Sequence, residues 1–346
     1  ANLLVRGASK LALSFGISPL VVGLTVVAFG TSAPEVAVSV GAVLDGKTDL
    51  AIGNVVGSNI FNVLFILGVS ALITPLLVNA QLIRQEVPVM IAASLLLLAL
   101  GWDGRLGQAD AAVLLALMVV YTGFLIVQSR RASAAGRGTG PGGTDSAQPG
   151  PVGWDASLPA QLLLIGAGLA ALVLGSEWLV SAAVSFAKAL GVSDLVIGLT
   201  IVAAGTSMPE VATSITAAAK GERDIAVGNV VGSNVFNILG CLGLSGLFAG
   251  HAGLTMAPSL LSFDIWVMLA VALACLPVFF SGREIARWEG GVFLAYYLAY
   301  VAYLILAAQQ HDALPLFSGA MMSFVLPLTA LTFVVLMLRR GPASPP

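Results

Sequence analysis

The chain has 346 residues, of which 9% are charged and 58% hydrophobic, and its mean hydropathy is +1.00. Soluble globular chains carry roughly a quarter charged residues, so this composition excludes an ordinary soluble domain and indicates an integral membrane protein. The formal net charge of −2 argues against a nucleic-acid-binding protein. Cys241 and Cys275 both lie in apolar runs, where a small buried hydrophobic residue is the expected role rather than a disulfide.

Continuous apolar runs follow one another along the chain, separated by short polar or Gly/Pro-containing breaks. Runs of about 20 apolar residues are long enough to cross a bilayer as helices. A transmembrane β-barrel would instead show alternating segments of roughly ten residues. We therefore predict an all-α membrane protein with spans near 18–44, 50–73, 86–102, 109–128, 160–187, 194–219, 225–248, 263–281, 289–308 and 314–338.

The longest polar segment, residues 129–157, is rich in Gly, Pro and Ser. This composition predicts a flexible linker. The linker separates a first transmembrane region, residues 1–128, from a second, residues 158–308. Residues 309–346 then form one extra C-terminal helix and a tail.

The two transmembrane regions are related by an internal repeat. A shift of 175 residues aligns residues 30–70 with residues 205–245 without a gap, and 25 of the 41 positions are identical. The identities include Thr, Ser, Pro, Glu, Asp and Asn, which a shared apolar composition cannot explain. Residues 18–73 and 193–248 are thus two copies of one unit.

The first copy is shorter at its start. Ala1–Val5 aligns with Ser176–Val180, and 15 mostly apolar residues, QLLLIGAGLAALVLG, precede that point only in the second copy. We therefore expect that the given chain begins partway through its first helix. We expect an apolar extension ahead of Ala1 in the full-length protein, with processing at a signal peptide as the alternative.

Counting that first helix, each repeat has five helices, so matching helices cross the membrane in opposite directions. The basic residues agree with this inverted-topology repeat. If the linker is cytoplasmic, 12 of the 15 Lys and Arg residues are inside, and only Lys47, Arg105 and Lys188 are outside. This positive-inside pattern predicts a protein of the cytoplasmic (inner) membrane, with the N-terminus outside and the linker and C-terminus in the cytoplasm.

Each copy places a carboxylate inside an apolar run, Glu35 in GTSAPE and Glu210 in GTSMPE. Such a carboxylate costs at least about 2.5–3.5 kcal/mol, which favours a functional role. On a helix, Thr31 and Ser32 share a face with Glu35. The following span carries a second polar stripe, and the polar positions outside GTSxPE are Asn54, Ser58 and Asn62 in the first copy and Asn229, Ser233 and Asn237 in the second.

The proline of each motif offers a further ligand. Within a helix, Pro34 would remove its own N–H and free the carbonyl of Gly30, and Pro209 would do the same for Gly205. Carboxylate, hydroxyl, amide and carbonyl oxygens select Ca²⁺, Mg²⁺, Na⁺ or K⁺ over zinc or copper. Inverted repeats with interrupted polar helices are typical of secondary transporters, whose site lies near the membrane midplane.

Simpler structural roles compete for some of these residues. Gly53 and Gly57 form a GxxxG pattern, which predicts close helix packing. Single Ser or Thr residues in membrane helices commonly bond to the preceding turn.

The two copies of GTS[AM]PE, each followed by GNVVGSN[IV]FN, resemble the α-repeats of the sodium/calcium exchanger family within the calcium/cation antiporters. The resemblance implies a ten-helix core in which helices two, three, seven and eight surround one central site, while helices one and six slide. By motif position it implies that Ca²⁺ is bound by Thr31, Glu35, Thr206 and Glu210. It further implies Na⁺ positions completed by Ser32, Ser58, Asn62, Ser207, Ser233, Asn237 and carbonyls near Ala28 and Ala203.

The implied function is antiport of Ca²⁺ against Na⁺ by alternating access, with no prosthetic group. Many family members have an aspartate where this chain has Asn237, so the coupling ion stays open. The alternatives are H⁺/Ca²⁺ exchange, in which protons compete for one of two close glutamates, and K⁺-dependent exchange. A channel suits a paired carboxylate site less well than a transporter does.

An enzyme is the remote alternative. A membrane-embedded hydrolase would need a nucleophile with a base, but His251 and His311 both lie outside the repeats and no GxSxG occurs. We therefore predict a transporter whose partners are Ca²⁺, monovalent cations and the lipid bilayer.

Overall fold

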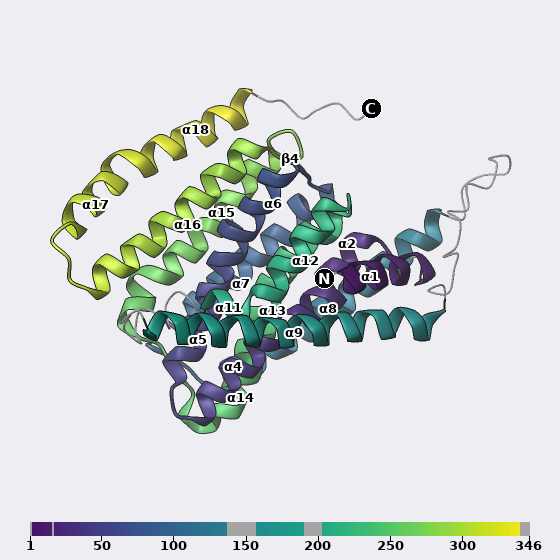
Figure 1. Ribbon diagram of the computed structural model, residues 1–346, viewed down its shortest axis with the longest axis horizontal. Coiled ribbons are helices and arrows are strands. Elements are labelled where there is room, and N and C mark those ends of the chain that lie inside the picture. The colour runs from purple at the N-terminus through teal and green to yellow at the C-terminus, as the bar shows by residue number, and fades with distance from the viewer. Residues whose placement is uncertain (1, 16, 137–156, 190–202, 340–346) are drawn as a thin grey trace.

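The chain forms a bundle of helices in the computed structural model, which describes residues 2–15, 17–136, 157–189 and 203–339 (Figure 1). Within these residues, eight helices are long and apolar enough to cross a membrane. One further candidate span is a pair of shorter helices, Pro19–Thr31 and Ala33–Leu44, with a bend of 42° between them. The predicted all-α membrane fold is confirmed.

The first transmembrane region is helical apart from short connections. Its helices are α1 (Asn2–Phe15), α2 (Pro19–Val22), α3 (Ala28–Thr31), α4 (Ala33–Leu44), α5 (Thr48–Phe61), α6 (Gly68–Ile73), α7 (Val87–Leu100) and α8 (Gln108–Gly136). Three π-helical segments continue the spans, η1 (Gly23–Val27), η2 (Asn62–Leu67) and η3 (Leu82–Glu86). Two short strands, β1 (Leu76–Leu77) and β2 (Arg105–Leu106), lie between helices.

The second region repeats this order. Its helices are α9 (Leu158–Ala189), α11 (Ala203–Thr206), α12 (Met208–Ala219), α13 (Arg223–Phe236), α14 (Leu242–Ala249), α15 (Ile265–Phe280) and α16 (Arg287–Ala308). Its shorter elements are η6 (Asn237–Cys241), η7 (Gly250–Ala252), β3 (Leu254–Thr255), η8 (Leu260–Asp264) and β4 (Glu284–Ile285). The extra C-terminal helix follows as α17 (Leu314–Ala320), η9 (Met321–Val325) and α18 (Leu326–Arg339).

Helix α8 extends into the segment predicted as a linker. Helix α8 continues to Gly136 rather than ending at residue 128, because the Arg and Ala residues that follow Ser129 are strong helix formers. The rest of the predicted linker, residues 137–156, lies outside the described residues, and α9 begins directly after it at Leu158. Residues 190–202, which include the start of the span predicted at 194–219, also lie outside them.

The repeats interlock. α1 packs against α9, its counterpart in the second repeat, and α13 packs against α2, η1 and α3 of the first repeat. Glycine allows the second contact: a Cβ on Gly232 would stand 2.6 Å from the carbonyl oxygen of Leu24, and one on Gly228 would stand 2.9 Å from that of Leu20. Gly228 and Gly232, the equivalents of Gly53 and Gly57 in the second copy, thus pack closely. A Cβ on Gly53 or Gly57 would meet no described atom within 4 Å, so the packing predicted for these two glycines stays a prediction.

Two small antiparallel sheets tie the repeats together at the helix ends. β1 pairs with β4, aligning Leu76 with Ile285, and β2 pairs with β3, aligning Leu106 with Leu254. Because η3 and α7 run from β1 to β2 as one candidate span, Leu82–Leu100, the two sheets lie at opposite ends of the bundle. The loops predicted as cytoplasmic and those predicted as external thus form separate groups.

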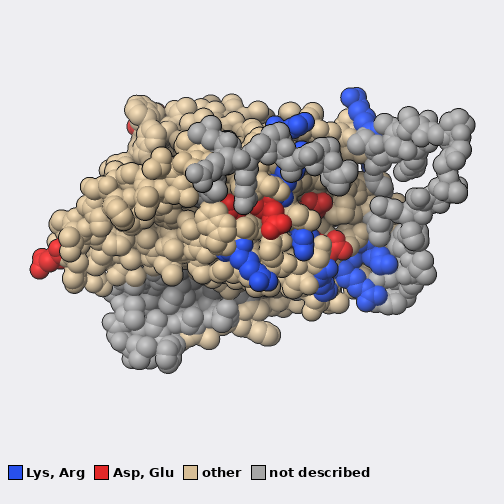
Figure 2. All heavy atoms as spheres, turned by 90° about the horizontal axis from the view of Figure 1, so that it is seen from above, with Lys and Arg blue, Asp and Glu red and all other residues tan. Residues whose placement is uncertain are grey.

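Charged side chains are grouped on part of the surface, whereas the outer helices expose mainly apolar side chains. Figure 2, which looks down on the molecule of Figure 1, shows Lys, Arg, Asp and Glu gathered near the middle and right of that face, with most of its left half uncharged. Apolar side chains are widely exposed on the outer helices, for example Val119 (67%), Leu163 (69%) and Leu316 (80%). These surfaces are suited to lipid.

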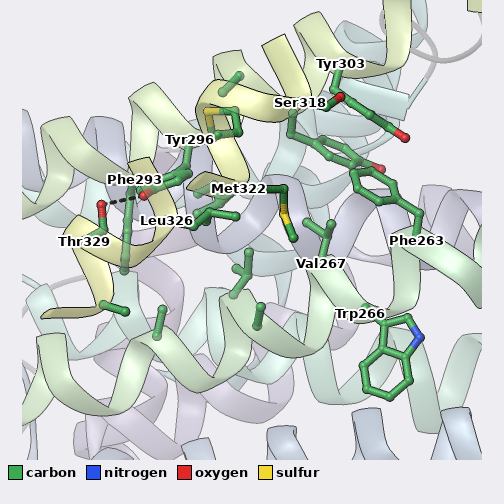
Figure 3. Close-up of a pocket in the computed structure, with 18 of the residues that line it drawn as sticks. Phe263, Trp266, Val267, Phe293, Tyr296, Tyr303, Ser318, Met322, Leu326 and Thr329 are labelled. Carbon is green, nitrogen blue, oxygen red and sulfur yellow. Dashed lines mark hydrogen bonds between the residues drawn. The ribbon is translucent and has the colours of Figure 1, made fainter. Parts of the chain in front are cut away.

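The C-terminal helix covers one flank of the bundle, far from α1 (Figure 1). Between α17–α18 and the core helices α15 and α16 lies a cavity of about 520 Å³. Figure 3 shows its mainly apolar and aromatic walls and the hydrogen bond from the Tyr296 hydroxyl to Thr329 Oγ1, at 2.5 Å. None of the polar residues predicted for the ion site lines this cavity.

Candidate functional site

Each GTSxPE motif breaks a span rather than lying within a continuous helix. α3 ends at Thr31 and α4 begins at Ala33, and Ser32 between them has φ −84° and ψ 9°. The second repeat has the same break at Ser207, with φ −87° and ψ 9°. Pro34 and Pro209 therefore stand in the first turn of the helix that follows each break, where proline is well tolerated, and the predicted position inside a helix is wrong.

The two broken spans meet through reciprocal hydrogen bonds. The Ser32 hydroxyl donates to Glu210 Oε1 at 2.8 Å, and the Ser207 hydroxyl donates to Glu35 Oε1 at 2.8 Å. Ser233 Oγ lies 3.5 Å from Glu210 Oε1, and Ser58 Oγ lies 3.2 Å from Ser207 Oγ. Each glutamate is thus held by a serine of the opposite repeat, so the two motifs form one cluster.

The glutamates are fully buried and carry no compensating charge among the described residues. Glu35 and Glu210 are both 0% exposed, and the groups that act electrostatically on them are hydroxyls, backbone and each other, with no lysine or arginine. A buried charge without a partner is strongly unfavourable. The negative charge of the cluster would therefore be balanced by a bound cation.

Four buried oxygens of this cluster accept no hydrogen bond from the part of the chain that is described. They are Glu35 Oε2, Glu210 Oε2, Asn62 Oδ1 and Asn237 Oδ1. They are equivalent in pairs under the repeat, and buried polar atoms in native proteins are nearly always satisfied. Two carboxylate and two amide oxygens without donors form a hard-ligand set that fits Ca²⁺ or Na⁺.

The threonines point to asparagines of the opposite repeat. Thr31 Oγ1 lies 3.1 Å from Asn229 Oδ1, and Thr206 Oγ1 lies 3.4 Å from Asn54 Oδ1. Thr31 Oγ1 also lies 3.1 Å from the carbonyl of Val27, which is the simpler bond to the preceding turn. The supporting role predicted for Asn54 and Asn229 thus has a geometric basis, since each amide meets a motif threonine.

The structure gives fewer contacts for the backbone carbonyls that were predicted as ion ligands. The Ala28 carbonyl accepts the Ser32 N–H at 3.0 Å and also lies 3.3 Å from the Thr31 hydroxyl. Ala203 is the first residue of α11. The predicted freeing of the Gly30 and Gly205 carbonyls stays a prediction.

Sequence reasoning missed four polar residues that support the site. Ser39 and Ser214 accept hydrogen bonds from the amides of Asn54 and Asn229, at 3.1 and 2.9 Å. Asn59 and Asn234, both 2% exposed, bond to the amides of Asn237 and Asn62. The signal was available in the sequence, because all four are polar residues that are identical at matching positions of the two copies.

Known proteins match most of the chain. The family model described as sodium/calcium exchanger protein matches residues 1–127 and 160–306. Inner membrane protein YrbG of Escherichia coli is 40% identical over 276 residues, which cover 79% of this chain and 82% of that protein. Sodium/calcium exchanger MaX1 of Methanosarcina acetivorans is 34% identical over 333 residues, which cover 87% of this chain and 93% of that protein.

The fold also matches that of a solved sodium-calcium exchanger. The sodium-calcium exchanger NCX_Mj, soaked with Na⁺ and Sr²⁺, matches with a TM-score of 0.71 and 32% sequence identity. The match covers 87% of this chain and 92% of that one.

Proposed function

This chain belongs to the sodium/calcium exchanger family, and we propose from that premise that it exchanges Ca²⁺ for Na⁺ at the buried cluster between its repeats. The family consists of transmembrane antiporters, so the chain is a transporter and not an enzyme. The observation that carries the proposal is a set of four buried oxygens that accept no hydrogen bond from the described residues, on Glu35, Glu210, Asn62 and Asn237.

The ion positions follow from charge. One Ca²⁺ between Glu35 and Glu210 neutralises both carboxylates, and two Na⁺ do the same. The hydroxyls of Thr31, Ser32 and Ser58, with their counterparts Thr206, Ser207 and Ser233, supply neutral oxygens around that centre. The amide oxygens of Asn62 and Asn237 and the carbonyls near Ala28 and Ala203 complete the coordination that Ca²⁺ requires, which is six to eight oxygens.

Coupling follows from the same charges. An empty site leaves two carboxylates facing each other in a low-dielectric interior, where a pair of unit charges about 5 Å apart repels by ~3 kcal/mol even at an effective dielectric constant of 20. A loaded site is neutral. The switch between inward- and outward-open states is therefore favourable only with ions bound, which couples Ca²⁺ movement to Na⁺ movement.

Proton/Ca²⁺ exchange is the second candidate. It is favoured by the amide at Asn237 and by the absence, among the described residues, of a basic partner for either glutamate, because a buried carboxylate that lacks a cation is neutralised most simply by a proton. Potassium-dependent exchange would use the same oxygens, which bind K⁺ as hard ligands.

Reconstituted vesicles separate these candidates. Proteoliposomes loaded with Na⁺ and diluted into Na⁺-free buffer should take up external Ca²⁺, and vesicles loaded with K⁺ or carrying only a pH gradient should take up much less. Collapsing the Na⁺ gradient with an ionophore is the control. Uptake driven by the pH gradient alone would establish the second candidate, and uptake indifferent to Na⁺ would overturn the first.

We place the protein in the cytoplasmic membrane with its N-terminus outside and its C-terminus and linker inside. The grouping of loops supports this: Lys47 and Arg105 adjoin the β2–β3 sheet, where Thr48 accepts a hydrogen bond from Thr255, whereas Arg283 and Arg287 flank β4. The end of the bundle that carries more Lys and Arg residues is expected to face the cytoplasm. A reporter that is active only in the cytoplasm should work when fused after Pro346, and its silence there would reverse the orientation.

A further inference from the structure

Four asparagines join the two repeats at the base of the proposed ion site. Asn59 and Asn62 lie on α5 and η2, and Asn234 and Asn237 lie on α13 and η6. The side-chain nitrogen of Asn62 donates to Asn234 Oδ1 at 3.0 Å, and that of Asn237 donates to Asn59 Oδ1 at 3.1 Å. The four side chains are at most 2% exposed, so water does not substitute freely for these bonds.

Asn59 and Asn234, the outer pair of the four, are held by hydrogen bonds to the main chain. Asn62 and Asn237 are the inner pair. The Asn59 side-chain nitrogen donates to the carbonyl oxygen of Asn234 at 3.2 Å, and the Asn234 nitrogen donates to that of Asn59 at 3.3 Å. A backbone carbonyl only accepts hydrogen bonds. This fixes which end of each outer amide is nitrogen, and the oxygen of each outer amide must then face the inner asparagine of the opposite repeat.

The orientation of the outer amides fixes the orientation of the inner amides. Asn62 and Asn237 meet an oxygen, so each must present its nitrogen to the outer asparagine and its own oxygen to the other side. That other side holds Asn62 Oδ1 and Asn237 Oδ1, the two amide oxygens that accept no bond from the described residues. The chain of bonds thus leaves these two oxygens on the side of the inner amides that faces away from Asn59 and Asn234.

We propose that Asn59 and Asn234 are positioning residues for ion binding, which hold the Asn237 and Asn62 amides with their oxygens toward the cation. This inference rests on the exchange function proposed above. It also accounts for the amide at position 237: an aspartate there would set a carboxylate oxygen against Asn59 Oδ1, two acceptors without a proton between them. Asn59 therefore favours a hydrogen-bond donor at position 237 over an ionised carboxylate.

A matched pair of substitutions tests the idea. Asn59→Val and Asn59→Thr give side chains of the same shape, but only threonine keeps an oxygen that can accept from Asn237. In Asn59→Val the Asn237 nitrogen loses its acceptor and gains by turning toward the carboxylates of the ion site, so a cation must reverse that turn to bind. In Asn59→Val we expect the affinity for Ca²⁺ and Na⁺ to fall roughly tenfold, about 1.4 kcal/mol. In Asn59→Thr we expect most of the wild-type affinity to remain.

Isothermal titration of purified, full-length protein with Ca²⁺ and with Na⁺ is the readout, and each variant is also placed in an Asn237→Ala background. If Asn59 acts through the Asn237 amide, the difference between Val and Thr should vanish in that background. Equal affinities of the two single variants, or a difference that persists undiminished without the amide, would overturn the proposal.

Two further comparisons keep the test decisive. If Asn59→Val does not fold, Asn234→Val and Asn234→Thr, judged in an Asn62→Ala background, make the same comparison through the other repeat. Failure of the wild-type protein to bind Ca²⁺ or Na⁺ would instead refute the exchange function, which is a separate outcome.

Discussion

Replacing Glu35 or Glu210 with glutamine is expected to lower Ca²⁺ transport at least about 100-fold in proteoliposomes, because losing one member of a buried charged set commonly costs 3–5 kcal/mol. Glutamine keeps the size of the side chain and can still accept from Ser207 or Ser32. It removes one of the two negative charges that balance Ca²⁺, and it brings an N–H₂ group into a set of oxygens. The two variants should be impaired alike, because the repeats contribute equivalent ligands.

Glu86 provides a control of the same residue type and burial. It is 0% exposed, but its oxygens already accept from Gln81, Gln85 and Tyr121, at 2.8, 2.8 and 2.6 Å. Glu86→Gln should therefore lower the thermal stability, since one donor loses its acceptor, and should retain Ca²⁺ transport per folded molecule. Wild-type transport by Glu35→Gln, or equal losses in all three variants, would show that the site is not where we place it.

Gly232→Ala is expected to destabilise the protein and weaken ion binding together. The new Cβ would stand 2.6 Å from the carbonyl oxygen and 2.7 Å from the Cα of Leu24. These are backbone atoms, which cannot turn aside as a side chain can, so α13 must move away from η1. Overpacking of this kind costs about 1–3 kcal/mol. The shift would also separate Thr31 from Asn229, whose side chains are now 3.1 Å apart.

Thermal unfolding in detergent and Ca²⁺ titration measure the two effects. Gly123→Ala is the matched control, because Gly123 lies on an exposed face of α8 and a Cβ there meets no described atom within 4 Å. That change should leave stability unchanged or slightly raised, as alanine favours helix over glycine. A Gly232→Ala protein as stable as the Gly123→Ala protein would mean that the α13–η1 contact is looser than described.

The internal repeat made the main features of the site predictable from sequence. Glu35 and Glu210 are costly in a membrane span, and their duplication at a fixed offset, on helices that cross in opposite directions, places them together. The structure brings Ser32 to Glu210 and Ser207 to Glu35, in line with that reasoning. The repeat also identified Asn54 and Asn229, which meet the threonines.

Other features depend on contacts that one sequence does not display. The sequence predicts an interrupted span at this motif but does not show that Pro34 stands in the first turn after the break, because proline in a first turn and proline in a helix interior look the same in sequence. The bonds of Asn59 and Asn234 run between repeats, so periodicity within one helix could not reveal them. Helix α8 overran the predicted boundary because the residues after Ser129 favour helix before the glycine- and proline-rich part begins.

One measurement tests most directly whether a single site between the repeats serves both ions. Ca²⁺ is titrated calorimetrically into the purified protein at a series of Na⁺ concentrations. The apparent Kd for Ca²⁺ should rise with Na⁺, with a slope on logarithmic axes that approaches two or more, while the number of Ca²⁺ ions bound at saturation stays constant. A Kd that is indifferent to Na⁺, or Ca²⁺ and Na⁺ bound together at independent sites, would contradict the shared site.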